Sequence, residues 1–523
     1  MEIPTEPSNI QDSTTVTALP EDVASIAESL GMQISADEVK LYAEAIARLE
    51  TAMLDFPTKE EDRPPLFPTS RDTGRRPSHE EDPYNCFITR CFVKGASNGP
   101  LSGLSVGVKD NISVAGVQMT LGSKFMEDFI PDIDATIVTR LLSAGANITG
   151  KTNMDDFSRM GQGFGTGVAA FGRCLNPHAP DHLTGGSSSG SAAAVASEAV
   201  DLAIGGDQGG SIRMPSAWCG VVGLKPTFGL VPYTGVVGLE PLLDHVGPMS
   251  RTVEGVAAAL ECVAGPDGYD PRQTGVPQAG SFKIEMSKGI EGLRVGLLKE
   301  GFGPATEPDV ESAVRCAADT LRAAGVNVRE VSLPIHLSIG KILPAFAWIG
   351  NALMIKTYGA TFLQGYNDTN LATALGKFLP SRINSLPPTV KLSLLFEAFL
   401  GSRAYLYYGR AQNLRRSYSR AYGEVFGEVD CLLMPTVPIK APVYTPSSDR
   451  LEILSRTFLR RLWGVAAQNS PQANITGHPA LTVPCGLSKG LPIGMMLVGP
   501  HFSDALLLRV AHVYEQLVDW KTK

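Results

Sequence analysis

The first 56 residues combine a polar start with a helical pattern of apolar positions. Residues 1–20 are polar and acidic and contain no apolar core. Within 22–56, Ser35 and Glu38 have the spacing of a capping box. The apolar positions behind this box form one helical stripe: Val39, Tyr42, Ile46, Leu49 and Met53. Two helices cannot bury such a stripe by themselves, so we expect them to pack on the main body or on a second copy, and we predict a homodimer.

Proline and charged residues dominate 57–82, which indicates a linker draped over the surface. The pattern then changes to a buried strand over 104–108, a helix over 134–144 and a second strand over 146–150. This alternation continues through the 200s. It predicts an α/β body with a largely buried sheet.

A similar alternation returns later, with strands over 293–298 and 326–331 around a helix over 307–324. Further helices extend to about 400, and a long helix over 402–427 leads back to the main body. We therefore expect four parts: an N-terminal helical extension and linker (1–82), the first part of a large domain (83–280), a small α/β and helical insertion (281–400) and the second part of the large domain (401–523).

Composition narrows the class of protein. The 523 residues carry a formal net charge of −8, which argues against a nucleic-acid surface. The eight cysteines are scattered without a CxxC or Cys/His pairing, so we expect neither disulfides nor a metal site, and no cofactor. The chain has no uninterrupted run of about 18 apolar residues. We expect a soluble cytoplasmic protein.

Candidate chemistry concentrates between Thr184 and Pro215. Two glycine-flanked serine clusters, 185–191 and 209–211, are joined by an Ala-rich stretch that we expect to be helical over 192–203. Glycine pairs permit positive φ and close approach of a ligand. A phosphate cradle is the competing interpretation, but the first cluster lacks the Gly-Lys-Ser/Thr ending of a P-loop.

A serine nucleophile needs a base. None of the eight histidines has a spacing or a carboxylate partner that marks a Ser-His-Asp set. A lysine can serve if burial lowers its pKa, and Lys109, at the end of its apolar strand, is the best candidate. The alternative interpretation of Lys109 is an ordinary lysine whose side chain extends to the surface and has no catalytic role.

These residues together resemble the amidase signature family of serine hydrolases. The resemblance covers about 95–265 and resumes at 430–515. It implies that family's fold, a central mixed sheet flanked by helices. The matching segments are Lys109, GGSSSGSAAA (185–194), GGSIRMP (209–215), MPTVP (434–438), NITGHPALTVPCG (474–486) and GLPIGMMLVGP (490–500).

The N-terminal helices and the sequence Gly-Asp-Gln-Gly-Gly-Ser (206–211) resemble a subgroup of this family, the bacterial amidases found alongside nitrile hydratase. Fungal and yeast amidases that cleave carbamates such as ethyl carbamate, the urethanases, are plausible neighbours.

The resemblance implies a role for each catalytic residue. Ser211 matches the nucleophile, Ser187 the bridging serine, preceded by a cis peptide, and Lys109 the base. Ser211 would pass its proton through Ser187 to neutral Lys109, and water would then cleave the acyl-enzyme. The backbone N–H groups at the oxyanion hole would be those of Gln208, Gly209, Gly210 and Ser211.

Substrate contacts are expected where a strand ends and in the less transferable middle of the chain. Asp207 has a second interpretation, as the partner of Arg213 that orients the loop. For Trp348, a position in the hydrophobic core explains the sequence as well as a position in the apolar wall of the substrate pocket does. The expected substrate-binding residues are Phe157, Ser158, Met160, Gly161, Asp207 and Trp348.

Three functions fit these observations. The main prediction is an amidase that converts small aliphatic or aromatic amides, with carbamates as a further class, to acid and ammonia, without nucleic acid or membrane. The alternative is the glutaminase subunit of a tRNA-dependent amidotransferase, which the N-terminal extension and Gln208 count against. The third is an inactive scaffold, and the intact set of Lys109, Ser187 and Ser211 counts against it.

Overall fold

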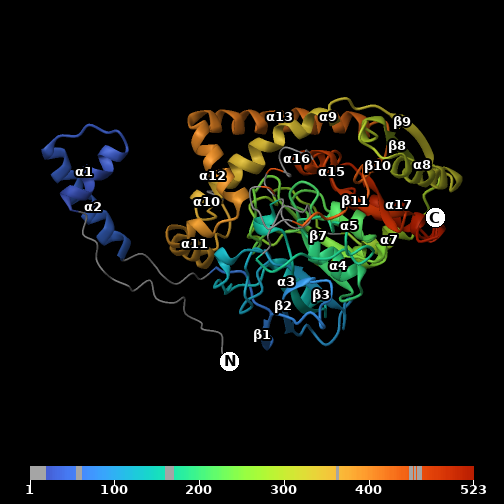
Figure 1. Ribbon diagram of the computed structural model, residues 1–523, viewed down its shortest axis with the longest axis horizontal. Coiled ribbons are helices and arrows are strands. Elements are labelled where there is room, and N and C mark those ends of the chain that lie inside the picture. The colour runs from blue at the N-terminus through green and yellow to red at the C-terminus, as the bar shows by residue number, and fades with distance from the viewer. Residues whose placement is uncertain are drawn as a thin grey trace. The chain divides into compact units, whose positions relative to one another are not determined.

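The computed structural model describes residues 19–54, 62–159, 170–278, 280–360, 364–446, 452, 455 and 462–522. The chain divides into two compact units, Met1–Arg63 and Pro64–Lys523 (Figure 1). Each unit is described below by itself.

The first unit is a pair of helices, α1 (Pro20–Ser29) and α2 (Ala36–Leu54). The predicted capping box is present: the Ser35 N–H donates to Glu38 Oε2 at 2.8 Å, and the Glu38 N–H donates to Ser35 Oγ at 3.3 Å. The predicted stripe is exposed within this unit, where Tyr42, Ile46, Leu49 and Met53 are between 39% and 64% exposed. The helix pair therefore buries little of its own apolar surface.

The second unit is built on a sheet of twelve strands in the order β1-β2-β4-β3-β5-β7-β6-β11-β12-β10-β8-β9. The sheet is mixed, as the resemblance implied, because parallel and antiparallel pairs both occur. The strands are β1 (Arg71–Arg75), β2 (Phe87–Val93), β3 (Ser105–Lys109), β4 (Asn147–Thr152), β5 (Leu202–Asp207), β6 (Val222–Lys225), β7 (His245–Ser250), β8 (Arg294–Leu298), β9 (Asn327–Val331), β10 (Cys431–Pro435), β11 (Ala480–Ser488) and β12 (Leu491–Val498).

Helices pack on both faces of this sheet (Figure 1). They are α3 (Thr136–Ser143), α4 (Ser189–Ala196), α5 (Arg213–Cys219), α6 (Val253–Val263), α7 (Phe282–Met286), α8 (Pro308–Ala323), α9 (His336–Ile339), α10 (Asn351–Lys356), α11 (Thr369–Arg382), α12 (Pro388–Leu400), α13 (Ser402–Phe426), α15 (Leu462–Ala466), α16 (Pro471–Thr476) and α17 (Asp504–Leu517), with a π-helical turn, η6 (Ala345–Gly350).

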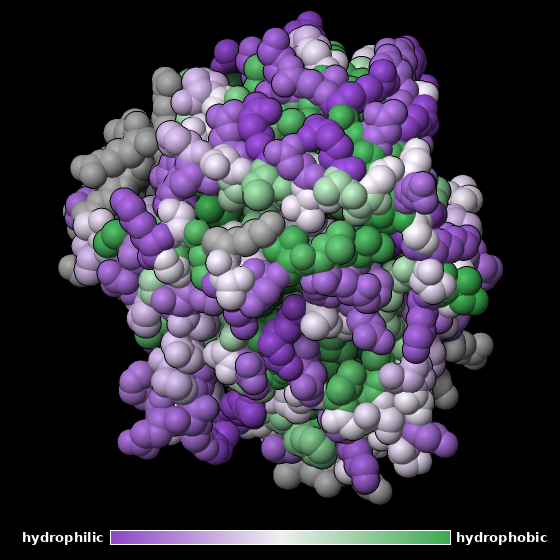
Figure 2. All heavy atoms as spheres, turned by 90° about the vertical axis from the view of Figure 1, so that its right-hand side faces the viewer, coloured by the Kyte–Doolittle hydropathy of each residue, from purple (hydrophilic) through white to green (hydrophobic). Residues whose placement is uncertain are grey.

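Side-chain alternation along a strand separates the two layers. In β10, Cys431 and Leu433 lie in the core that contains α3, α6, α8 and α17, whereas Leu432 and Met434 lie in the core beneath α13 and η6. Figure 2 shows the side of the molecule on the right of Figure 1, where hydrophilic residues surround a band of hydrophobic ones.

The expected strands at 293–298 and 326–331 exist as β8 and β9, and they extend the central sheet through β10. Two sequence expectations differ from the structure. The helix expected over 192–203 ends at Ala196, because Glu198 takes a positive φ of 61° and the chain enters β5 at Leu202. The expected linker contains β1, which pairs antiparallel with β2.

One helical stretch, His336–Lys356, is long and apolar enough to cross a membrane by length and composition alone, and 44% of its most apolar window is buried inside the protein. Its residues Ile339, Leu343 and Phe346 belong to the core beneath α13. The buried core helix of a soluble protein passes the same test.

Candidate active site

Lys109 ends the central strand β3. Because β3 runs parallel to both β4 and β5, the carboxyl ends of all three strands meet at one edge of the sheet. Lys109 is fully buried there, and its Nζ donates a hydrogen bond to Ser187 Oγ at 2.7 Å. Burial lowers the pKa of Lys109 from 10.5 to about 7, although nearby carboxyl groups oppose this shift. The lysine is therefore available as a base near neutral pH.

The loop that carries Ser187 is held against the end of β4. The Gly186–Ser187 peptide is cis, as the resemblance implied. A Cβ added at Gly186 would lie 2.3 Å from Asp155 Oδ2, so any larger residue here would displace the Asp155 carboxylate. The Asp155 N–H donates to the Ser187 carbonyl at 3.1 Å. Asp155, which was not among the predicted site residues, thus helps to hold Ser187 in position.

Ser211 lies just before α5 and is 8% exposed. Its carbonyl accepts a hydrogen bond from the Ser188 N–H at 3.2 Å, which joins the two serine-bearing loops. Ser188 Oγ also donates to the Gly206 carbonyl at 3.0 Å. The structure therefore joins the loops of Ser187 and Ser211 and places Ser187 against Lys109.

Asp207 directs its carboxylate into the protein. Its two oxygens accept hydrogen bonds from Arg213 Nε and Nη2, each at 3.0 Å, and Asn474 Nδ2 donates to Oδ1 at 3.0 Å. Burial raises the pKa of Asp207, but the charge and hydrogen bonds of Arg213 and the Asn474 amide outweigh burial and lower it overall. This geometry favours the second interpretation of Asp207, as the partner of Arg213 that orients the loop.

The predicted oxyanion donors are not equivalent. The Gly210 N–H donates to Asp207 Oδ1 at 2.7 Å, so it is not free to bind a substrate oxygen. The N–H groups of Gln208, Gly209 and Ser211 donate to no described acceptor and remain candidates. Gly210 has a φ of 121°, and a Cβ there would lie 2.5 Å from Ser470 Cβ.

The predicted substrate residues fall into two groups. Phe157 packs with Phe125 at a ring-centroid distance of 5.9 Å and belongs to an apolar cluster, and Ser158 follows it with a positive φ of 57°. Met160 and Gly161 lie outside the described residues.

Trp348, on η6, contacts a residue that sequence analysis missed. The Arg159 Cζ lies 3.9 Å from the centre of the Trp348 ring, and the guanidinium donates to the Ala347 carbonyl. Arg159 is only 4% exposed, and burial lowers its pKa to about 9. No carboxylate in the described part of the chain pairs with it. Its only signal in the sequence is its place in the turn after β4.

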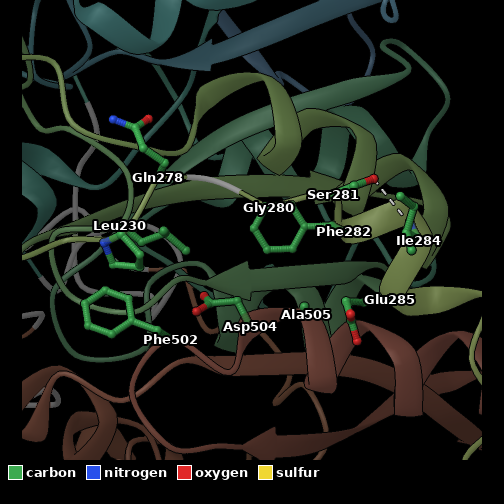
Figure 3. Close-up of a pocket in the computed structure, with 11 residues that line it drawn as sticks. Leu230, Gln278, Gly280, Ser281, Phe282, Ile284, Glu285, Phe502, Asp504 and Ala505 are labelled. Carbon is green, nitrogen blue, oxygen red and sulfur yellow. Dashed lines mark hydrogen bonds between the residues drawn. The ribbon is translucent and has the colours of Figure 1, made fainter.

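A surface pocket of roughly 280 Å³ lies apart from these residues, between α7 and the start of α17. Figure 3 shows Phe282 facing Asp504 and Ala505 across it. Its lining includes none of the candidate catalytic residues. Among the described residues, no cluster of three or more His, Cys, Asp or Glu side chains could hold a metal ion.

Comparisons with known proteins assign the class that this fold and site define. A family model described as Amidase matches residues 88–508. The A subunit of glutamyl-tRNA(Gln) amidotransferase from Synechococcus sp. is 37% identical over 425 residues, which are 80% of this chain and 84% of that protein. The chain therefore belongs to the amidase family, whose members hydrolyse C–N bonds.

Solved structures agree with this assignment. The A subunit of glutamyl-tRNA(Gln) amidotransferase from Thermotoga maritima superposes with a TM-score of 0.67 and 30% identity, over 83% of this chain and 88% of that one. Peptide amidase from Stenotrophomonas maltophilia gives a TM-score of 0.64 and 30% identity, over 80% and 83% of the two chains. The predicted amidase-signature fold is confirmed.

These relatives overturn the main functional prediction. A free-standing amidase for small amides or carbamates is wrong, because the similarity to amidotransferase A subunits favours the alternative. The finer resemblance to nitrile-hydratase-associated amidases and to urethanases is not supported for the same reason. The partner prediction, a small-molecule amide without nucleic acid and a homodimer, is also wrong, since these relatives are named as subunits of an enzyme that acts on a tRNA.

Proposed function

We propose that this chain is the glutaminase subunit of a tRNA-dependent amidotransferase. The observation that carries the proposal is identity to A subunits over four fifths of the chain, 37% in the Synechococcus protein. The N-terminal extension does not count against it, because the family match begins at residue 88 and the first unit ends at Arg63. A cytoplasmic location and a tRNA-binding partner subunit belong to the same proposal.

The reaction begins with a proton relay. Ser211 Oγ attacks the side-chain carboxamide carbon of glutamine while its proton moves to Ser187 Oγ, and the Ser187 proton moves to the Lys109 lone pair. The 2.7 Å contact between Lys109 and Ser187 supports the second transfer. The oxygen of the tetrahedral intermediate is negative, and free backbone N–H groups at 208, 209 and 211 would stabilise it.

Collapse of the intermediate returns the proton from Lys109 through Ser187 to the departing nitrogen. The C–N bond breaks, ammonia leaves, and the glutamyl group remains as an ester on Ser211. Water then attacks the ester carbon, using the same two residues as base, and glutamate is released. In an amidotransferase the ammonia would be used on the aminoacyl-tRNA rather than lost.

Arg159 supports an amino-acid substrate. Its turn is anchored at the bridging serine through Asp155, and its guanidinium lacks a carboxylate partner among the described residues. A buried guanidinium gains most from a charged acceptor that binds two of its N–H groups. The α-carboxylate of glutamine is such an acceptor.

The proposal is tested by ammonia release from glutamine, propionamide, benzamide and ethyl carbamate, with wild type beside Ser211→Ala. We expect release from glutamine in preference to the other three, lost in the variant. Addition of the remaining amidotransferase subunits and glutamyl-tRNA should convert that release into amide formation. Turnover of propionamide or ethyl carbamate without glutamine would reject the proposal.

A further inference from the structure

Three side chains converge on Gly206, near the end of β5 and just before the nucleophile loop. A Cβ added to Gly206 would lie 3.3 Å from Gln208 Nε2 and 3.6 Å from both Asn111 Nδ2 and Lys109 Nζ. The space that a side chain at Gly206 would fill is thus bordered by the Gln208 carboxamide on one side and by the Lys109 amine on another. Gln208 is buried, and its Nε2 donates to the Tyr233 hydroxyl at 3.2 Å.

The proton relay requires hydrogen-bond acceptors around protonated Lys109. Once Lys109 has taken a proton, Nζ carries three N–H groups, and Ser187 Oγ can accept only one of them along the relay. Nζ has no hydrogen bond to any other described residue. In a fully buried site, an ammonium with unused donors is costly. Gln208 Oε1 is a buried oxygen without a hydrogen-bond partner among the described residues.

We propose that Gln208 is a positioning residue whose side-chain oxygen accepts a hydrogen bond from protonated Lys109. A half-turn of the carboxamide exchanges Nε2 and Oε1, which puts the oxygen on the side of Gly206 and Lys109. The Tyr233 hydroxyl can accept from the nitrogen or donate to the oxygen, so it holds the carboxamide in both orientations. The proposal rests on the roles given to Ser211, Ser187 and Lys109, but not on glutamine as the substrate.

Three charged groups face Lys109, and none of them accepts a hydrogen bond from Nζ in the described structure. They are Asp155 after β4, Asp207 at the end of β5 and Asp244 before β7. Asp207 is paired with Arg213. Burial and the neighbouring Glu240 raise the pKa of Asp244 to about 8, so this carboxyl is largely protonated at neutral pH.

The test uses the full chain and measures how the reactivity of Ser211 falls as pH is lowered. This fall, with its midpoint at the pKa of Lys109, is called the acid limb. Inactivation by phenylmethanesulfonyl fluoride is measured against pH, because Ser211 reacts only while Lys109 is neutral. Wild type should gain reactivity as pH rises through about 7. Gln208→Glu places a carboxylate beside the ammonium and should move this limb up by about one pH unit or more. Gln208→Met removes the acceptor and should move it down.

A matched control is Gln278→Met, at an exposed position in the separate surface pocket, which should leave the limb in place. A purely structural role of Gln208 would lower the rate equally at every pH, and that result, or an unmoved limb in both Gln208 variants, would overturn the proposal. Failure to hydrolyse glutamine with a normal limb shift would instead reject only the glutaminase function.

Discussion

The surroundings of Lys109 suit it to the proposed role of base. Burial lowers its pKa from 10.5 to about 7, and Asp155 is foremost among the carboxyl groups that oppose the shift. Because the proposed relay needs the neutral amine, activity should be lost as pH falls below this pKa. Lys109, Ser187 and Ser211 could be predicted from the sequence because an apolar strand end and two glycine-serine clusters carry them, and their catalytic roles stay predictions.

Arg159 could not be identified in this way, because its partner Trp348 is far along the chain and only folding brings the two together. Replacement by methionine removes a charged hydrogen-bond donor that contributes about 1.5–3 kcal/mol to binding, so the KM for glutamine should rise by roughly 10- to 140-fold. Steady-state assays of ammonia release measure this change.

The same Arg159→Met variant should hydrolyse a glutamine derivative with a blocked α-carboxyl group as well as wild type does. Arg159→Lys should have a KM for free glutamine between those of wild type and Arg159→Met. An equal loss with the free and the blocked substrate would show that Arg159 supports the fold rather than the carboxylate.

Among the elements, the loop between β5 and α5 carries most of the proposed chemistry, and a buried ion pair holds its shape. Asp207 accepts from the Gly210 and Ile212 N–H groups at 2.7 and 3.0 Å while it pairs with Arg213. The loop therefore depends on a charge network that is out of contact with water. Arg213 could be predicted as a partner because it is close in sequence, whereas Asn474 could not, because it lies more than 260 positions from Arg213.

Arg213→Met should destabilise the protein by about 3–5 kcal/mol, because it leaves the buried Asp207 carboxylate without its partner. Arg294→Met is the matched control, since Arg294 pairs with Asp430 at the surface and its side chain is 44% exposed; its loss should cost about 1 kcal/mol or less. Urea unfolding measures both changes. Equal shifts of the midpoint in the two variants would contradict this account.

Strands and helices with a regular spacing of apolar residues could be predicted from the sequence. Elements that form only because a distant strand pairs with them could not. The strand at 104–108 and the long helix at 402–427 appear as β3 and α13, displaced by one residue at most. β1, with the sequence Arg-Asp-Thr-Gly-Arg, has no apolar alternation and is a strand only because β2 pairs with it. The early end of α4 likewise depends on β5 joining the sheet beside β3.

For the whole molecule, fold and family followed from the sequence, but the function did not. A fold and a family do not determine substrate and partners, which depend on the particular site that a member builds. Over 335–400, where substrate contacts were expected, the sequence had no motif to match. The N-terminal extension misled the functional prediction, because it lies in a separate unit outside the family match.

The central claim is that Ser211 attacks glutamine and carries its acyl group. Wild type mixed with glutamine, quenched in acid within one turnover and digested, should give a glutamyl ester on the peptide that contains Ser211, detected by mass spectrometry. Ser211→Ala should give no adduct. Glutamine hydrolysis with an adduct on another residue, or continued hydrolysis in Ser211→Ala, would contradict the account.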